Sequence, residues 1–454
     1  MGLARVKTFV LENSPAWLVV SLMRRFVTKS DYQSKRESIT IFQRANVAYG
    51  AKRQNRSARL LRVAFGLLGD EFPTSYARLI IGATNQTQLD ASRRGALSSE
   101  ILDATKSLAV NITDATGWYQ LSRGLFSVGY FRAAWVAREN SIELSIREGE
   151  VGGAAANAVG RAIQAHLERR NFTEVEQLLQ KSANDIKPNS LRDIRDYLDM
   201  MENKYVMPPL DPASPDFDAE KLFSELITGK SVALVGPGSP SGHYGDEIDS
   251  ADTVVRIKYV GREHLPPQEF HGHRTTIIYL NQTELDGMLD RDSKFALRNK
   301  DNEIQVILSY RFANLKKSVV PVFSTLKSPY INRTTAHSGL IALFNLLCNF
   351  PKQIMVYGFD FYANVGDYNI WHTNFLSSSG DLLALTPGIV FNYLIESKSF
   401  RVSGFADHDP VSNFCFAQNL YKAGLFEIEP LGASILALTP YQYVERLEDM
   451  LGDW

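Results

Sequence analysis

The pattern of apolar and polar positions changes character midway along the chain. In residues 54–204 apolar positions recur three and four apart, with almost no proline before Pro188, and this period predicts helices. Residues 205–217 hold four prolines, which cannot continue a helix, so we expect an extended linker. In residues 218–454 short β-branched runs alternate with helical segments. The pattern predicts an α/β domain with a Rossmann-like, mostly parallel sheet, preceded by an all-α domain.

The second half contains six short apolar runs that we expect to be strands, with two helices among them. Parallel sheets of this kind bind ligands outside the carboxyl ends of their strands. The expected strands are Ser231–Val235, Thr253–Ile257, Arg274–Tyr279, Glu303–Ser309, Gln353–Tyr357 and Phe400–Ser403, and the expected helices are Ser338–Asn349 and Gly388–Glu396.

The helical half contains a segment similar to a tetratricopeptide repeat. Residues 117–140 alternate large and small residues, among them Trp118, Phe131 and Ala134, at spacings typical of two crossing helices. Residues 160–179 repeat the helix, turn, helix plan at a longer interval. An irregular repeat array and a plain helical bundle both fit the pattern. Either would be a scaffold, which could hold an acceptor or dock a protein partner.

The N-terminal segment, residues 1–53, is basic. The first 62 residues hold 13 Lys/Arg against 3 Asp/Glu. The apolar run Ala16–Met23 is shorter than the ~20 residues that span a bilayer, and no signal-peptide cleavage site follows. It is expected to be a core-facing helix, or else an amphipathic segment on an anionic membrane surface with Trp17 at the interface.

Composition narrows the class of protein. The chain has 454 residues, 44% of them hydrophobic, which is ordinary for a globular protein of two or three domains. The net charge of −1 gives no reason to expect nucleic-acid binding. With only Cys348 and Cys415, no disulfide framework is implied. We therefore expect a cytoplasmic protein, at the inner face of the membrane if the basic segment binds lipid.

The stretch from Lys230 to Gly261 is the centre of the candidate chemistry. It reads as a strand, a glycine-rich turn and a second strand. Glycines such as Gly236 and Gly238 carry no Cβ atom, so their amide N–H groups could approach an anionic ligand at the end of the first strand. A nucleotide phosphate is the expected ligand.

The turn lacks the fingerprints of common nucleotide sites. A dinucleotide fold would carry G-x-G-x-x-G and an acidic residue at the end of the second strand, but this strand ends with Arg256 and Ile257. No P-loop is present either. An NADP-dependent oxidoreductase that uses Arg256 remains an alternative.

Two groups of residues resemble the motifs of the eukaryotic-type sialyltransferase family. The first resembles the large sialylmotif, and the residues Gly272–Thr276 look like its continuation. The second resembles the small sialylmotif, while Trp371-His372 and His408 resemble the two further motifs. The matches to the large motif are Val235-Gly236, Gly245, Glu247-Ile248-Asp249-Ser250, Asp252 and Arg256, and those to the small motif are Ser338-Gly339, Cys348 and Tyr357-Gly358-Phe359.

The chain departs from the family pattern at three positions. Pro237 stands where the family has asparagine, and proline has no N–H to donate. Lys258 replaces another asparagine and could meet a phosphate as a mobile cation. Asn413 replaces the glutamate expected five residues after the histidine. The chain therefore resembles a distant, bacterial-type member.

The resemblance implies an inverting glycosyltransferase that moves a 2-keto sugar acid from its CMP conjugate to a glycan or glycolipid hydroxyl. His408 would be the general base, because an imidazole titrates near neutral pH, and His372 would donate to the phosphate. Glu247, Asp249 and Asp252 are expected to be structural. The CMP-sugar is a co-substrate, and neither a metal nor another cofactor is expected. The residues expected to bind the nucleotide are Gly236, Pro237, Gly238, Ser239, Arg256, Lys258, Ser338, Gly339, Tyr357 and Gly358.

The sequence does not decide which CMP-sugar is the donor or whether the protein is catalytically active. Sialic acid and the related octulosonic acid Kdo are both compatible with the motifs. Ser338 is also a preferred N-cap residue whether or not a ligand is present. A non-catalytic nucleotide-binding module on a repeat scaffold is a further alternative, because Pro237, Lys258 and Asn413 depart from the family.

Overall fold

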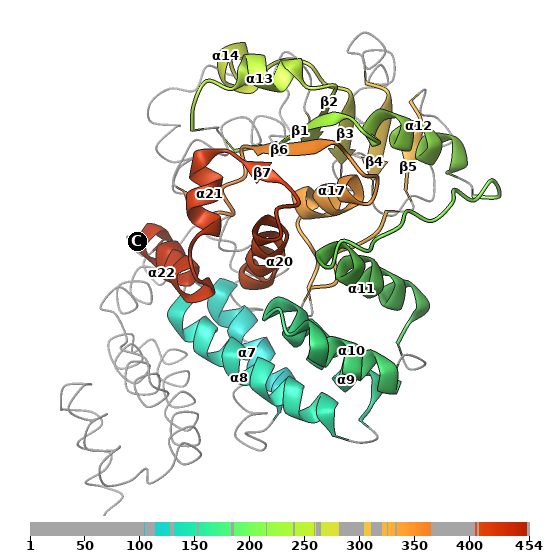
Figure 1. Ribbon diagram of the computed structural model, residues 1–454. Coiled ribbons are helices and arrows are strands. Elements are labelled where there is room, and N and C mark those ends of the chain that lie inside the picture. Colours follow the sequence, from blue (N-terminus) through green and yellow to red (C-terminus); the bar gives the residue numbers. More distant parts are fainter. Residues whose placement is uncertain are drawn as a thin grey trace, which may run out of the picture. The chain divides into compact units, whose positions relative to one another are not determined.

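A computed structural model describes much of the chain from Asp114 to Leu451 (Figure 1). The described part begins with the isolated Ala104, and the predictions made for residues 1–53 lie outside it. The described residues are 104, 114–127, 131–151, 154–182, 186–214, 216–238, 241–257, 259, 265–280, 304–309, 320–324, 326–331, 334–364, 405 and 408–451.

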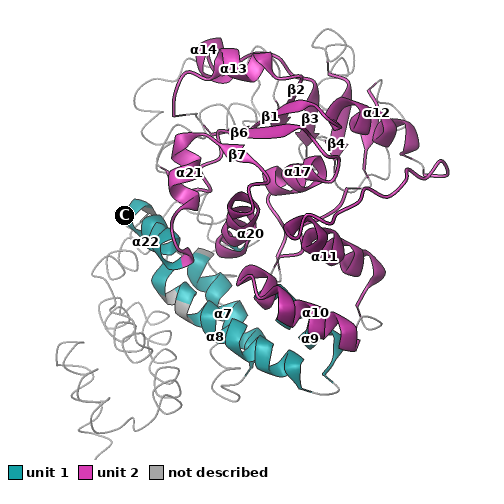
Figure 2. Ribbon diagram, viewed as in Figure 1, with its two compact units in different colours: residues 1–165, 398–409, 441–454 teal, residues 166–397, 410–440 magenta. Residues whose placement is uncertain are grey.

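The chain forms two compact units (Figure 2). Unit 1 comprises residues 1–165, 398–409 and 441–454, and unit 2 comprises residues 166–397 and 410–440. Each unit thus draws on segments from distant parts of the sequence. In the predicted linker, the described residues 205–214 and 216 form neither helix nor strand. The predicted domain boundaries, at residues 53, 204 and 217, stay a prediction.

The described part of unit 1 is helical. It contains α7 (Ala115–Ser127), α8 (Phe131–Glu150), most of α9 (Ala156–Glu168) and α22 (Pro440–Leu451). Trp118 and Phe131 are buried, and the Phe131 ring packs edge-on against Phe405 at 5.8 Å. The helical structure predicted for residues 54–204 is confirmed in α7, α8 and α9, whereas α22 was not predicted. The choice between a repeat array and a bundle stays open.

Unit 2 contains a seven-stranded sheet in which every pair of neighbouring strands is parallel. The strand order is β5-β4-β3-β2-β1-β6-β7. The predicted α/β class with a parallel sheet is therefore confirmed. The strands are β1 (Ser231–Val235), β2 (Thr253–Ile257), β3 (Ile277–Leu280), β4 (Val306–Ser309), β5 (Val322–Phe323), β6 (Gln353–Tyr357) and β7 (Glu427–Ile428).

Helices lie on both sides of the sheet (Figure 1). On one side, Ile248 of α13 (Gly245–Ser250) packs against Val235, Val254 and Tyr357 in one buried cluster. On the other side lies α17 (Ser338–Leu347), which is buried at nearly every position because its residues are almost all apolar. The remaining described helices of this unit are α10 (Phe172–Ser182), α11 (Pro188–Met201), α12 (Phe217–Ile227), α14 (Gln268–His271), α20 (Pro410–Lys422) and α21 (Pro430–Leu436).

The predicted elements agree best where apolar runs are longest. The bounds of β1, β2 and β6 are as predicted, whereas β3 and β4 begin three residues later than expected. The two-residue strands β5 and β7 were missed because they are too short to show a period. The predicted strand at 400–403 and the helix at 388–396 lie outside the described residues. None of the described helices is long and apolar enough to cross a membrane.

Candidate functional site at the carboxyl edge of the sheet

The carboxyl ends of β1 and β6 form the topological switch point of the sheet. β1 pairs with β2 on one side and with the much later β6 on the other. Val235 and Tyr357, the last residues of the two strands, are aligned with each other. The glycine-rich turn after β1 and the Gly358–Phe359 segment after β6 therefore meet at this edge, where ligands of open α/β sheets bind.

The two segments pack backbone against backbone. The Gly236 amide donates to the Tyr357 carbonyl at 2.8 Å, and the Gly238 amide donates to the Gly358 carbonyl at 3.1 Å. A Cβ atom on Gly236 would lie 2.5 Å from the Gly358 carbonyl oxygen. The glycines are thus required by the approach of the neighbouring segment. The expectation that the Gly236 and Gly238 amides face an anionic ligand is wrong, because both are paired within the protein.

A buried carboxylate, Glu429, closes this turn. Its side chain accepts hydrogen bonds from the Ser241 amide at 2.6 Å, the Ser241 hydroxyl at 3.1 Å and the Gly358 amide at 2.5 Å. Glu429 is 3% exposed and stands between β7 and α21. Its negative charge disfavours a phosphate among these same donors. Sequence reasoning missed Glu429, because β7 is too short to mark it as a residue at a strand end.

The start of α17 offers donors at the same edge. Ser338 is the first residue of the helix, not its N-cap as the residue type suggested, because the N-cap position is held by His337 without a side-chain cap. The first-turn amides of a helix have no intrahelical acceptor and favour anions. Within the described part of the chain, the backbone bonds of this turn run from Leu340 and Ile341 to the His337 carbonyl, and the Ser338 and Gly339 amides are left open.

Phe359 joins the two sides of the site. Its ring lies directly against the Cα of Gly339, where a Cβ atom would overlap the ring, and it also borders Gly236. The structure therefore brings together the predicted residues Gly236, Gly238, Gly339 and Gly358.

Arg256 is buried and donates hydrogen bonds to several nearby acceptors. Its guanidinium donates to the carbonyls of Arg274, His271 and Gly272 and to the Thr275 hydroxyl, at 2.8–3.0 Å. Burial lowers the pKa of Arg256 to about 10. These contacts hold the loop after α14, and the predicted nucleotide contact of Arg256 stays a prediction.

Two of the three acidic residues in the large-motif match have clear structural roles, as predicted. The Asp249 carboxylate accepts from the amides of His273 and Arg274 at 2.8–3.0 Å. The Asp252 carboxylate accepts from the amide and hydroxyl of Ser231 at 2.9 and 2.8 Å. Asp249 therefore fastens the loop before β3 to α13, and Asp252 fastens the turn before β2 to the start of β1.

The last residue of β6 is a buried tyrosine. The Tyr357 ring lies 5.5 Å from the Tyr244 ring. Burial, with the neighbouring Glu247 carboxylate, raises the pKa of Tyr357 above its usual range.

Neither of the two predicted catalytic histidines is among the described residues of unit 2. His408 belongs to unit 1, where the adjacent Asp409 carboxylate accepts from the Arg138 guanidinium at 2.7 Å and both partners are buried. His372, Ser239 and Lys258 lie outside the described residues.

Asn413, where the resembled family has a glutamate, has a structural role. Its side-chain oxygen accepts a hydrogen bond from the His337 amide at 2.8 Å, and this contact fixes the start of α17.

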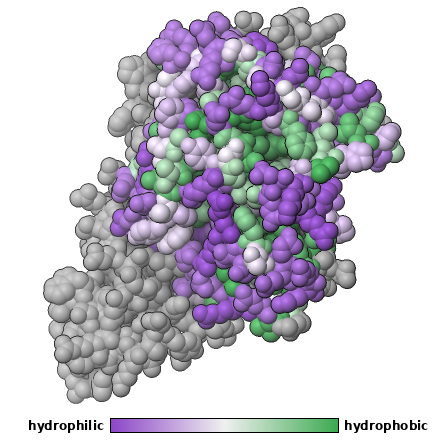
Figure 3. Space-filling view, viewed as in Figure 1, coloured by the Kyte–Doolittle hydropathy of each residue, from purple (hydrophilic) through white to green (hydrophobic). Residues whose placement is uncertain are grey.

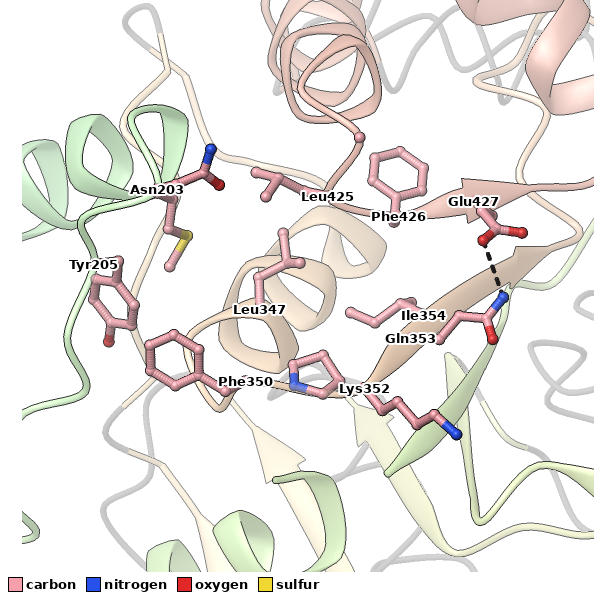
Figure 4. A pocket seen from close by; sticks show the side chains of 13 residues that line it. Asn203, Tyr205, Leu347, Phe350, Lys352, Gln353, Ile354, Leu425, Phe426 and Glu427 are labelled. Carbon is pink, nitrogen blue, oxygen red and sulfur yellow. Dashed lines mark hydrogen bonds between the residues drawn. The ribbon is translucent and has the colours of Figure 1, made fainter. Parts of the chain in front are cut away.

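A cavity of about 380 Å³ lies at the opposite end of the strands. Leu347, Ile354 and Leu425 line its apolar centre, beside the first residues of β6 and β7 (Figure 4). Hydrophobic residues are visible over β7 and α17 on this face (Figure 3). The Gln353 amide donates to Glu427 at 3.0 Å on its rim. The cavity thus does not include the residues of the switch point.

The described part of the chain contains no group of three or more His, Cys, Asp or Glu side chains arranged to hold a metal ion. Cys348 and Cys415 are both buried free thiols.

In comparisons with known proteins, no family model, no curated protein and no solved structure matches this chain.

Proposed function

We propose that the protein is an inverting glycosyltransferase that uses a CMP-linked 2-keto sugar acid, either sialic acid or Kdo. The observation that supports it is the meeting of Gly238 and Gly358 through a backbone hydrogen bond at the switch point. These residues belong to stretches that resemble two different sialylmotifs and lie far apart in the sequence. Their meeting is what a shared nucleotide site requires.

The described geometry favours the start of α17 as the phosphate-binding element. The Gly236 and Gly238 amides are paired within the protein, and Glu429 occupies the turn. By contrast, the amides of Ser338 and Gly339 are open at a helix N-terminus, which favours an anion. The Ser338 hydroxyl adds one further donor beside them.

The reaction needs few groups beyond this site. The bond between the anomeric carbon and the phosphate oxygen breaks, and its electron pair stays with CMP. The acceptor oxygen bonds to the same carbon from the opposite face, and its proton passes to a general base. His408 is the proposed base, and donors around the phosphate stabilise the charge that grows there. The acceptor is a glycan or glycolipid hydroxyl.

CMP release tests this proposal. The full-length protein is incubated with CMP-sialic acid and with CMP-Kdo, each with a pool of glycan and glycolipid acceptors, and free CMP is measured. Release from one donor is expected, and no release from either would contradict the proposal. The His408→Ala variant should lose transfer but still bind CMP, and retained transfer would reassign the base.

One observation favours a second candidate, a nucleotide-binding module without catalysis. The glycine turn has Pro237 without an N–H, and its Gly236 and Gly238 amides are already paired. A protein that binds CMP tightly but releases none from either donor would support this alternative.

A further inference from the structure

His337 and Tyr362, which are not among the residues that match the sialylmotifs, form a side-chain pair beside the proposed phosphate site. Nδ1 of His337 lies 3.3 Å from the Tyr362 hydroxyl oxygen, and the ring centroids are 5.0 Å apart. Both residues are half-buried. His337 immediately precedes Ser338, and Tyr362 follows Phe359 by three residues, so the pair borders both sides of the switch point.

Tyr362 is held in a strained turn. The Ala363 amide donates to the Asp360 carbonyl at 2.7 Å, and the Tyr362 amide donates to the Asp360 carboxylate at 2.9 Å. The two central residues, Phe361 and Tyr362, have φ of 48° and 62°. For bulky side chains this left-handed conformation costs about 1–2 kcal/mol per residue, and such strain gathers at ligand sites.

His337 is fixed from two directions. Its amide donates to the Asn413 side chain at 2.8 Å, and its carbonyl accepts from the Leu340 and Ile341 amides at 2.9 and 3.0 Å. The backbone on both sides of the pair is therefore set before any ligand binds. A preorganised donor of this kind is what a site that stabilises developing charge requires.

We propose that Tyr362 is a catalytic residue that donates a hydrogen bond to the phosphate of the CMP-sugar, and that His337 positions it. Nδ1–H of His337 donates to the Tyr362 oxygen, which directs the Tyr362 O–H toward the phosphate. As the glycosyl bond breaks, the electron pair moves onto this phosphate and the hydrogen bond strengthens. The 3.3 Å separation shortens when the ligand binds. The assignment rests on the proposed function.

The test measures binding and turnover separately in the full-length protein. Phosphorus NMR titrations with CMP and with inorganic phosphate give affinity, and CMP release from both CMP-sugars gives turnover. The variants are Tyr362→Phe, His337→Ala and His337→Asn, whose amide nitrogen stands near the Nδ1 position. Tyr421→Phe, which removes a hydroxyl near the end of α20, is the matched control.

We expect Tyr362→Phe to weaken CMP binding about tenfold, as for a lost hydrogen bond to a charged group, and to lower turnover further. His337→Ala should behave alike, whereas His337→Asn should recover most of the affinity. Tyr421→Phe should change neither quantity. A folded Tyr362→Phe variant with wild-type CMP affinity overturns the role of Tyr362, and equal losses in both His337 variants overturn the positioning role.

The two proposals fail in different ways. If the wild type binds CMP but releases none from either donor, the transferase proposal fails while the affinity series still decides whether Tyr362 contacts the phosphate. If neither CMP nor phosphate binds the wild type, the Tyr362 assignment is overturned as well. Thermal unfolding of each variant shows whether a loss of binding is a loss of folding.

Discussion

The Glu429 carboxylate accepts a hydrogen bond from the Gly358 backbone amide at 2.5 Å, so the start of α21 is tied to the end of β6. The same carboxylate accepts from the amide and hydroxyl of Ser241 in the glycine-rich turn. One buried acid thus connects three segments that follow three different strands. Because the acid is 3% exposed, these donors replace the water that an ionised carboxylate would otherwise need.

Replacing Glu429 should destabilise the protein. In Glu429→Gln one acceptor oxygen becomes an NH₂ group that faces amide donors, and hydrogen bonds to a charged acceptor are lost. We expect the free energy of unfolding to fall by about 2–4 kcal/mol, measured by urea denaturation. Glu427→Gln, an exposed position in β7 two residues away, is the control and should change it by less than about 0.5 kcal/mol. An equal effect of the two variants would contradict the role of Glu429.

Alanine substitutions at two glycines of the site, Gly236 and Gly339, should distinguish a rigid neighbour from one that can move. A Cβ on Gly236 meets the Gly358 carbonyl oxygen at 2.5 Å, whereas on Gly339 it meets the Phe359 ring. We expect Gly236→Ala to cost about 2–3 kcal/mol and Gly339→Ala less, because a ring can move more easily than backbone. Gly242→Ala, which meets only the Tyr244 side chain, is the control.

A double-mutant cycle measured by urea denaturation then tests the Gly339 contact. Replacing Phe359 with Leu should recover part of the loss in Gly339→Ala, because the overlapping ring is removed. Strictly additive losses would show that the ring is not the obstacle.

Arg256→Lys should lower stability although the charge is kept. Lysine cannot reproduce the planar donor set that serves the carbonyls of His271, Gly272 and Arg274. We expect a loss of about 2–4 kcal/mol in urea denaturation, because buried carbonyls lose their donors. Arg195→Lys, at an exposed position on α11, should be neutral. A Lys variant of wild-type stability that binds CMP weakly would instead support the nucleotide contact.

His271 should make the fold sensitive to acid. Burial and the nearby Arg256 guanidinium lower the pKa of His271 from 6.5 to about 3. The unfolded imidazole takes up a proton below pH 6.5 and the folded one does not, so this stability is complete above pH 6.5 and is lost as the pH falls toward 3. Between pH 7 and pH 5 the loss is about 2 kcal/mol.

Urea denaturation at pH 7 and at pH 5 checks the role of His271. His271→Gln, which does not titrate, should lose about 2 kcal/mol less than the wild type between these two values. His243→Gln, at an exposed position, should keep the wild-type dependence. A His271→Gln variant that loses as much stability as the wild type would refute the assignment.

Much of the parallel sheet could be predicted from the sequence, because β1, β2 and β6 are short runs rich in β-branched and apolar residues, most of which are buried. The start of α17 was also predictable to the residue, since polar residues give way there to an apolar helix. The glycines of the turn were recognised as places of close approach. In each case the signal is local in the sequence.

What approaches these glycines was decided only by the tertiary structure. Gly236 and Gly238 donate to carbonyls at and after the end of β6, and Glu429 reaches the turn from the end of β7. The pair of His337 and Tyr362 likewise depends on a turn with two left-handed aromatic residues, which their residue types do not suggest. The physical reason is that hydrogen-bond partners across a parallel sheet come from segments distant in the chain. The apolar pattern of a segment predicts that it is buried, but it does not identify the segment with which it pairs.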